Sequence, residues 1–296
     1  MNKETPKIVC FGEVLWDFLP SGKVAGGAPM NVAYHANQLG IHAQIISKIG
    51  KDELGNHLLD FLNKKGVDTT LVQTDYSFQT GTVNVVLDNN GSPSYDIASP
   101  VAWDYIHADK VNKTAVKTAD AFVFGSLSAR NETSRNTLLE LLNCAKLKVF
   151  DVNLRSPFYT KTMLMQLLNH SDIVKMNDEE LKIIGKWLAI EATQANAAIQ
   201  IKKHFNWQQL IVTRGAYGAW LFNKDGMTNS SGITTQVQDT IGCGDSFLAA
   251  FLSKFLQGEL PEKCLQFASL TGAYVATKKG GTPEFSETQI WELIKN

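Results

Sequence analysis

The sequence contains one stretch that decides its fold, Asp239-Thr240-Ile241-Gly242-Cys243-Gly244-Asp245, which leads into an apolar helical pattern over residues 246–256. Two glycines one residue apart let the main chain bend tightly because neither carries a Cβ atom. The first N–H groups of the following helix lack partners within it, and with the helix dipole they predict an anion site. Asp245 falls beside that site, where a carboxylate suits the activation of a hydroxyl group. An aspartate that only caps the helix is the alternative for this motif alone.

Two other phosphate-binding patterns are missing from the sequence. It contains no G-x-x-x-x-G-K-[ST] loop and no G-x-G-x-x-G at a strand-to-helix turn. The first pattern is typical of P-loop proteins and the second of dinucleotide-binding domains. The anion site is therefore not a P-loop, and a Rossmann dehydrogenase is a weak rival.

A second glycine-rich stretch, Gly26-Gly27-Ala28-Pro29-Met30-Asn31-Val32-Ala33, lies near the other end of the chain. Its glycines permit a ligand to approach the main chain, and its proline fits the first turn of a helix. Asn31 projects from that turn with one acceptor and two donors, which suits sugar hydroxyls. Asp17 lies upstream in an extended segment. Taken alone, the stretch could be a solvent-facing turn and Asp17 an ordinary surface residue.

Short apolar runs alternate with helical patterns through most of the chain and predict repeated β–α units. The apolar runs are consecutive, as in strands that are buried on both faces. The predicted strands are 7–11, 44–49, 121–125, 148–152, 172–176 and 210–213, and the predicted helices include 132–145, 178–186, 193–204, 245–257, 261–277 and 286–295. We expect a three-layer α/β/α sandwich with a mostly parallel central sheet, which binds its ligands at the carboxyl ends of the strands.

One region breaks this alternation. Residues 80–87 and 94–97 are typical of a hairpin around the turn Asp88-Asn89-Asn90-Gly91, because Asn-Gly is a strong turn signal. The segment 14–24 is also extended in character. We predict a single domain over residues 1–296, with a small β-sheet lid formed by inserted segments at about 14–25 and 78–103. The alternative is that these segments extend the main sheet.

Charge and composition exclude several classes of partner. In 296 residues, Lys and Arg total 28 and Asp and Glu total 29, so the net charge is −1. This balance argues against nucleic acid or an anionic membrane, because both need a basic surface. The first twelve residues lack the apolar core of a signal peptide and no apolar run approaches membrane-spanning length, so we expect neither a leader nor a membrane span. The four cysteines match no zinc-site spacing, so we expect reduced thiols in a cytoplasmic protein.

The two glycine motifs, one near each end, resemble the two signatures of the ribokinase (PfkB) family of carbohydrate kinases. The order of strands and helices fits that family over essentially the whole chain. The resemblance implies a ribokinase-like fold and an enzyme that transfers the γ-phosphoryl group of ATP to a primary hydroxyl of a sugar. It also implies Mg²⁺, a candidate K⁺ site near Asp239, and a homodimer that pairs through the lid.

The resemblance assigns catalytic and sugar-binding roles residue by residue. Asp245 matches the base that takes the proton from the sugar hydroxyl. The anion hole for the transferring phosphate is matched by the amides of Gly242, Cys243 and Gly244. The sugar-binding positions, two of them from a D-x-N-x-R motif at 151–155, are matched by Asp17, Gly27, Asn31, Asn153 and Arg155. A strand-end turn with a surface arginine is the alternative for the D-x-N-x-R motif.

Further segments resemble the nucleotide half of the family's site. Asn177-Asp178-Glu179-Glu180 resembles N-x-x-E, in which Glu180 would help to place Mg²⁺ through water, although an ordinary helix start is the alternative. Residues 213–218 resemble T-x-G-x-x-G. The ATP-binding residues implied by these motifs are Asn177, Thr213, Gly215, Gly218, Gly242 and Gly244.

The substrate is indicated by the segment Gly12–Pro20, GEVLWDFLP, which most resembles the G-E-x-L-x-D-x-x-P of bacterial fructokinases. We therefore expect fructose as substrate and fructose 6-phosphate as product. Asn84, Tyr95 and Ile97 are candidate lid residues of the pocket, and a role in packing is the alternative for them. A kinase for ribose, 2-keto-3-deoxygluconate or a nucleoside is the alternative, because a fold does not dictate its substrate. A non-catalytic sugar or nucleotide sensor is less favoured, since the base and the glycine turn are both intact.

Overall fold

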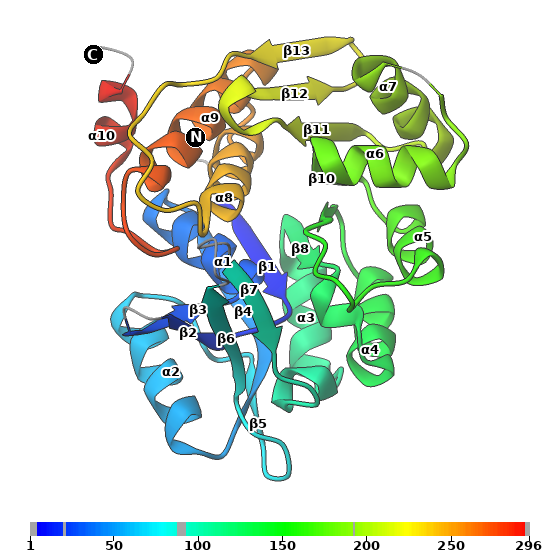
Figure 1. Ribbon diagram of the computed structural model, residues 1–296. Coiled ribbons are helices and arrows are strands. Elements are labelled where there is room, and N and C mark those ends of the chain that lie inside the picture. Colours follow the sequence, from blue (N-terminus) through cyan, green and yellow to red (C-terminus); the bar gives the residue numbers. More distant parts are fainter. Residues whose placement is uncertain (1–4, 20–21, 88–92, 192, 294–296) are drawn as a thin grey trace.

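A large sheet organises the computed structural model, which describes residues 5–19, 22–87, 93–191 and 193–293 (Figure 1). Its strand order is β13-β12-β11-β10-β9-β8-β1-β4-β5. The parallel strands are β1 (Lys7–Phe11), β4 (His42–Gly50), β5 (Val72–Asp75), β8 (Ala121–Gly125), β9 (Lys148–Asp151), β10 (Ile173–Asn177) and β11 (Gln209–Thr213). The antiparallel edge strands are β12 (Ala219–Phe222) and β13 (Met227–Ser230).

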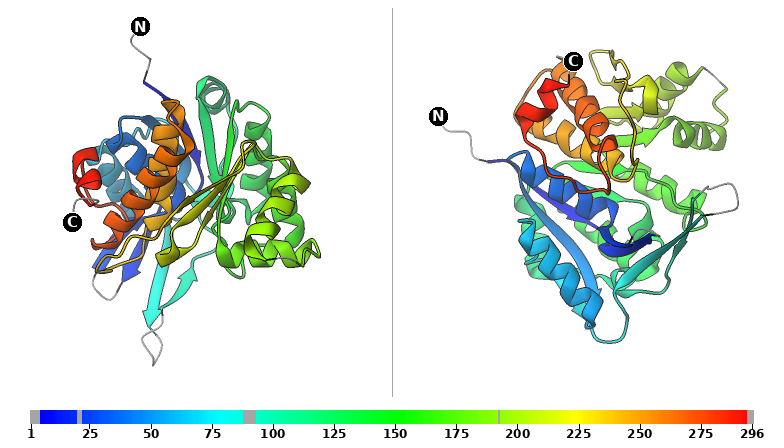
Figure 2. Two further views of the ribbon diagram at one scale, coloured as in Figure 1. Left: turned by 90° about the horizontal axis from the view of Figure 1, so that it is seen from above. Right: turned by 60° about the vertical axis from the view of Figure 1, so that its left-hand side comes forward.

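Helices cover both faces of this sheet (Figures 1 and 2). One core cluster contains Ile8 and Cys10 of β1, and the other contains their neighbours Val9 and Phe11. The first cluster is closed by α1 (Ala28–Gln38), α2 (Glu53–Lys64), α8 (Cys243–Leu256), α9 (Pro261–Ala276) and α10 (Glu287–Glu292). The second is closed by α3 (Lys110–Thr118), α4 (Glu132–Leu142), α5 (Lys161–Asn169), α6 (Asp178–Trp187) and α7 (Gln194–Phe205). The expected three-layer sandwich is confirmed, and burial on both faces explains the continuous apolar runs.

A separate sheet of order β3-β2-β6-β7 lies beside the main one. It comprises β2 (Leu15–Leu19), β3 (Gly22–Gly26), β6 (Gly81–Leu87) and β7 (Pro93–Ile97). Strand β2 pairs antiparallel with β3 and parallel with β6, while β6 and β7 form an antiparallel pair. The predicted segments therefore form their own small sheet and do not extend the main one. The predicted turn at residues 88–91 lies outside the described residues.

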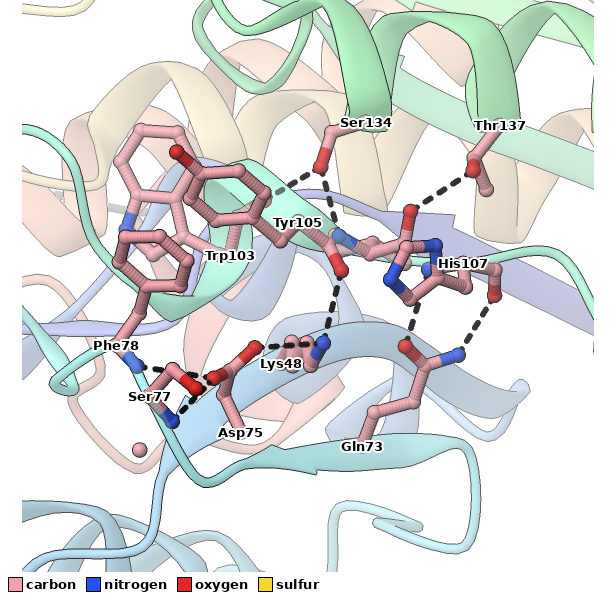
Figure 3. A network of polar contacts seen from close by, with 12 residues as sticks. Lys48, Gln73, Asp75, Ser77, Phe78, Trp103, Tyr105, His107, Ser134 and Thr137 are labelled. Carbon is pink, nitrogen blue, oxygen red and sulfur yellow. Dashed lines mark hydrogen bonds and ion pairs between the residues drawn. The ribbon is translucent and has the colours of Figure 1, made fainter.

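A buried ion pair joins the edge of the main sheet to the segments that lead into and out of this small sheet (Figure 3). Lys48 Nζ on β4 lies 2.7 Å from Asp75 Oδ2 on β5 and donates to the carbonyl oxygen of Tyr105 at 3.0 Å. The other oxygen of Asp75 accepts the main-chain N–H groups of Ser77 and Phe78. The Phe78 ring stacks on Tyr105 with centroids 3.9 Å apart. One lysine thus anchors the chain just before β6 and shortly after β7, where the short helix η1 (Ala102–Tyr105) ends.

Candidate active site

A cavity of about 670 Å³ opens at the carboxyl ends of the parallel strands. Strand ends and the loops that follow them supply Glu13 after β1, Leu127 after β8, Asp151 on β9, Asn177 on β10 and Thr213 on β11. The small sheet closes another side of the same cavity through Asp17, Val83 and Ile97. This position at strand ends is the one that parallel α/β sheets use for ligands.

Most of the sequence-predicted site residues line this one cavity. They are Asp17, Gly27, Asn31, Asn153, Arg155, Asn177, Glu180, Thr213, Gly242, Gly244 and Asp245. Residues far apart in the chain therefore meet, as the two-motif interpretation requires. Of the candidate lid residues, Ile97 lines the cavity and Asn84 does not, while the side chain of Tyr95 lies outside the description.

Three predicted residues do not line the cavity, namely Cys243, Gly215 and Gly218. The N–H of Cys243 donates to the carbonyl of Thr240 at 3.4 Å, so it is directed away from the opening. Burial raises the pKa of the Cys243 thiol to about 12, which leaves almost no reactive thiolate at neutral pH. Gly218 has φ 85°, and a Cβ there would collide with the carbonyl of Ser230. The tight return between β11 and β12 therefore needs a glycine at this position, and a contact of Gly215 or Gly218 with ATP stays a prediction.

Helix α8 begins with a set of exposed main-chain donors. Gly242 is its N-cap with φ 73°, a left-handed conformation that favours glycine. A Cβ on Gly242 would lie 2.5 Å from the carbonyl oxygen of Gly281, so the turn at residues 280–281 packs directly against it. Within the described residues, the N–H groups of Gly242, Gly244 and Asp245 have no hydrogen-bond partner. These three amides are therefore the free donors available to the anion site that the sequence predicts at this helix N-terminus.

Asp245 lies at the junction of this anion site and the cavity. Asn31 Nδ2 on α1 donates to Asp245 Oδ2 at 2.8 Å, which connects the two glycine motifs directly. Burial and the nearby negative charge of Asp151 raise the pKa of Asp245 to about 6. The Asn31 hydrogen bond and the charges of Lys175 and Arg155 act in the opposite direction. The carboxylate is therefore more basic than an ordinary aspartate and still ionised at neutral pH.

At the end of the cavity near the small sheet, the main chain at Gly26 and Gly27 packs closely against neighbouring residues. A Cβ on Gly27 would collide with the carbonyl of Glu13, and one on Gly26 would collide with the carboxylate of Asp17. Burial raises the pKa of Asp17 to about 6, and the positive charge of Arg155 opposes this rise. The Oδ1 atom of buried Asn31 has no partner in the described part of the chain. These groups offer hydrogen-bond acceptors to a polyol.

Glu13 is a member of this site to which the sequence analysis gave no role. It is only 3% exposed, and its Oε2 has no hydrogen-bond partner among the described residues. Burial raises its pKa to about 7, with the charge of Asp245 adding to the rise and hydrogen bonds from main-chain N–H groups opposing it. A buried carboxyl group with a free oxygen stores an unfavourable energy that a ligand hydroxyl could relieve.

Lys175 and Asp151 were also missed. Lys175 Nζ on β10 donates to both carboxylate oxygens of Asp151 on β9, each at 2.8 Å, and the two residues are direct neighbours in the sheet. Both are almost fully buried, and both line the cavity. A lysine inside the apolar run IVKMN is the sequence signal that could have found this pair.

Glu180 suits a contact with Mg²⁺ through water. Its two oxygens accept the main-chain N–H groups of Leu154 and Asn177, each at 2.8 Å, so the carboxylate is held rigidly. Burial raises its pKa above the ordinary value. Within the described ranges no group of three His, Cys, Asp or Glu residues could hold a metal. A single rigidly held carboxylate suits an ion whose other ligands are phosphate oxygens and water, which is the common arrangement for Mg²⁺.

The closing turn at residues 280–281 is fixed by two side chains. The carboxylate of Asp239 accepts the N–H groups of Ile241 and Gly280, each at 3.0 Å. His35 Nε2 lies 2.8 Å from the carbonyl oxygen of Gly281, and burial lowers the pKa of His35 to about 4. A neutral imidazole therefore donates this hydrogen bond, which holds the turn against Gly242. A K⁺ site at Asp239 stays a prediction.

Known proteins share both the sequence and this geometry. Residues 6–289 match the sequence model of the pfkB family carbohydrate kinases. The chain belongs to this family. The protein named "Probable fructokinase-3" from Arabidopsis thaliana is 32% identical over 93% of this chain and 87% of its own length. Fructokinase-1 from Zea mays is 30% identical, with 97% of each chain covered.

A solved structure agrees with these relatives. The fructokinase from Xylella fastidiosa with bound ATP has a TM-score of 0.86 and 27% sequence identity, and the match covers 98% of each chain. The ribokinase-like fold is thereby confirmed, and the protein is a carbohydrate kinase. Among the described residues, we find no helix with the length and apolar character needed to cross a bilayer.

Proposed function

We propose that the enzyme transfers the γ-phosphoryl group of Mg-ATP to the 6-hydroxyl of fructose, giving fructose 6-phosphate and ADP. The observation that carries the proposal is the hydrogen bond from Asn31 to Asp245, which joins the two glycine motifs in one cavity beside the free amides of α8. The names of the relatives support fructose over ribose, 2-keto-3-deoxygluconate or a nucleoside.

The sugar is proposed to bind at the small-sheet end of the cavity. Its hydroxyls would bind to the polar groups there, Asp17, Gly27, Asn31, Asn153 and Arg155. The nucleotide phosphates would lie toward the other end, near Asn177, Thr213, Gly242 and Gly244. Closure of the small sheet over the sugar would exclude water and limit wasteful hydrolysis of ATP. A cytoplasmic location and pairing of two copies through this sheet stay predictions.

Asp245 is proposed as the general base. Its pKa of about 6 keeps it ionised at neutral pH and makes it a better proton acceptor than an ordinary aspartate. It takes the proton of the primary hydroxyl while the sugar oxygen attacks the γ-phosphorus atom and the bond to ADP breaks. The amides of Gly242 and Gly244 stabilise the charge on the transferring group. When bound, Mg²⁺ would neutralise phosphate charge, and Glu180 would orient its water ligands.

The test is an ADP-release assay with Mg-ATP against fructose, ribose, 2-keto-3-deoxygluconate and nucleosides. Phosphorus NMR of the product then identifies the phosphorylated hydroxyl. We expect the highest kcat/KM for fructose, with phosphate on the 6-hydroxyl. A higher value for another acceptor would refute the substrate proposal, and no turnover with any acceptor would refute the catalytic one.

The role of Asp245 is tested by Asp245→Asn. The substitution keeps the hydrogen-bonding shape but removes the base, so kcat falls by about 10²–10⁴-fold while fructose binding, measured by calorimetry, survives. Near-normal turnover by this variant would contradict the assignment.

A further inference from the structure

The ammonium group of Lys175 lies at the anion site. A Cβ atom placed on Gly244 would be 3.2 Å from Lys175 Nζ, so the ammonium faces the first turn of α8 at close range. Its positive charge also lowers the pKa of Asp245. A fixed positive charge therefore lies beside the free amides of Gly242 and Gly244 and lines the cavity that they line.

One of the three N–H groups of the Lys175 ammonium has no hydrogen-bond partner among the described residues. A lysine ammonium carries three N–H groups, and Nζ of Lys175 makes two hydrogen bonds, both to Asp151. No other acceptor for Nζ exists among the described residues. Lys48, the other buried lysine that pairs with an aspartate on a neighbouring strand, also makes two such contacts, one to Asp75 and one to the carbonyl of Tyr105, but it does not line the cavity. The spare donor at the cavity thus distinguishes Lys175 from a lysine with a structural role.

The energetics of burial favour a functional role for this pair. Removing two charges from water costs several kcal/mol for each ion, about as much as their mutual attraction returns, so apolar residues would often stabilise a fold equally well. The ammonium nevertheless stays charged: burial, the largest single influence, lowers the pKa of Lys175, but the charge and hydrogen bonds of Asp151 together with the charges of Asp245 and Glu180 raise it by more. A permanently protonated lysine is suited to stabilise negative charge rather than to move a proton.

We infer that Lys175 is a catalytic residue of the proposed kinase reaction, whose spare N–H donates to an oxygen of the γ-phosphoryl group during transfer, and that Asp151 is its positioning residue. The inference rests on the proposed phosphoryl transfer. The phosphorus–oxygen bond to ADP breaks, the bond to the sugar oxygen forms, and Asp245 receives the hydroxyl proton. Lys175 exchanges no proton and stabilises the charge on the equatorial oxygens of the moving group.

The main test compares two double variants, each of which removes one buried Lys–Asp pair. Lys175→Met with Asp151→Asn removes both charges at the site, which avoids an unpaired buried carboxylate. Lys48→Met with Asp75→Asn removes the matched pair, which does not line the cavity. We expect the first variant to keep a Tm close to that of the matched control and its KM for fructose within about threefold, while kcat falls by about 10²–10³-fold. The control should keep kcat within about threefold of the wild type, and any loss from weaker anchoring of the small sheet should appear in its KM for fructose.

A second measurement does not depend on the sugar. Calorimetry compares the binding of ADP alone with that of ADP plus aluminium fluoride, which imitates the transferring phosphoryl group. The extra affinity given by aluminium fluoride should fall by about 10²-fold or more in the Lys175 variant and remain in the control. If fructose and all other acceptors fail as substrates, the proposed function fails, and this binding experiment still decides the role of Lys175. Unchanged aluminium fluoride affinity, or an equal loss of kcat in both double variants, would overturn the inference.

Discussion

Removing the amide of Asn31 should shift the pH dependence of catalysis by an amount that follows from the site. In Asn31→Leu, the carboxylate of Asp245 loses the hydrogen bond that Asn31 Nδ2 donates at 2.8 Å. A hydrogen bond to a charged group contributes about 1.5–3 kcal/mol, and 1.36 kcal/mol corresponds to one pKa unit, so the pKa of Asp245 should rise by about 1–2 units. Asp245 is 9% exposed, so solvent screens this effect little.

The sign of the shift follows from the charge state that is stabilised. Asn31 favours the ionised carboxylate, and its loss favours the protonated form that cannot act as a base. From about 6 in the wild type, the pKa moves to about 7–8, so the acid limb of the kcat/KM profile moves upward with it. Activity of the variant relative to its own maximum is therefore lowest below neutrality and recovers toward pH 9.

The assay is kcat/KM for fructose from pH 5 to pH 9 in both enzymes. Glu13, with a pKa of about 7, titrates in the same range, so the comparison is repeated with Glu13→Gln in both proteins. Loss of the Asn31 sugar contact lowers the height of the profile but does not move its midpoint. An acid limb at the same pH with and without Asn31 would refute either the role of Asp245 as base or its stabilisation by Asn31.

Further predictions concern neighbouring residues. Gly242→Ala places a Cβ 2.5 Å from the carbonyl of Gly281, about 1 Å closer than an ordinary contact, so the amides must move and kcat should fall by about 10²-fold. Steady-state kinetics test this, and a rate within about threefold of wild type would contradict it. Glu13→Gln should be more stable than wild type at pH 8 by up to about 3 kcal/mol, because the raised pKa of Glu13 means that the fold loses stability as the pH rises from about 4.5 to 7. Urea unfolding at pH 5 and pH 8 measures the gain, which should fall to below about 1 kcal/mol at the lower pH. Glu180→Gln should raise the Mg²⁺ concentration for half-maximal rate by about 10- to 100-fold, and an unchanged Mg²⁺ titration would argue against the metal role.

The sequence predicted the architecture because local patterns determine it. Consecutive apolar positions such as those of β1 and β8 identify strands that helices cover on both sides. The glycine at 242 and the proline at 29 mark helix starts by their own backbone preferences. Strand bounds at 7–11 and 121–125 were exact, whereas α4 ends at Leu142 rather than at residue 145.

The residues that escaped prediction act through long-range pairs. The importance of Lys175 depends on Asp151, which is adjacent only because β9 and β10 pair in one register. Glu13 stands out because its buried Oε2 atom has no partner among the described residues, which only the folded structure reveals. Conversely, the sequence pattern at 213–218 cannot reveal that Gly218 packs against the main chain of Ser230 on a neighbouring strand. Composition and spacing carry no information on such contacts.

The anchoring of β6 and β7 at Lys48 indicates which segment of this fold can change in length and sequence without disturbing the main sheet. The chain leaves the main body beside Asp75 and is tied to it again at Tyr105, with both points bound to the same ammonium. The hairpin of β6 and β7 could therefore be replaced by one of another length or sequence between Asp75 and Tyr105, without altering the register of the nine-stranded sheet. Because Val83 and Ile97 of that hairpin line the cavity, such an exchange would remodel the end where we propose that the sugar binds and leave the proposed phosphate end intact.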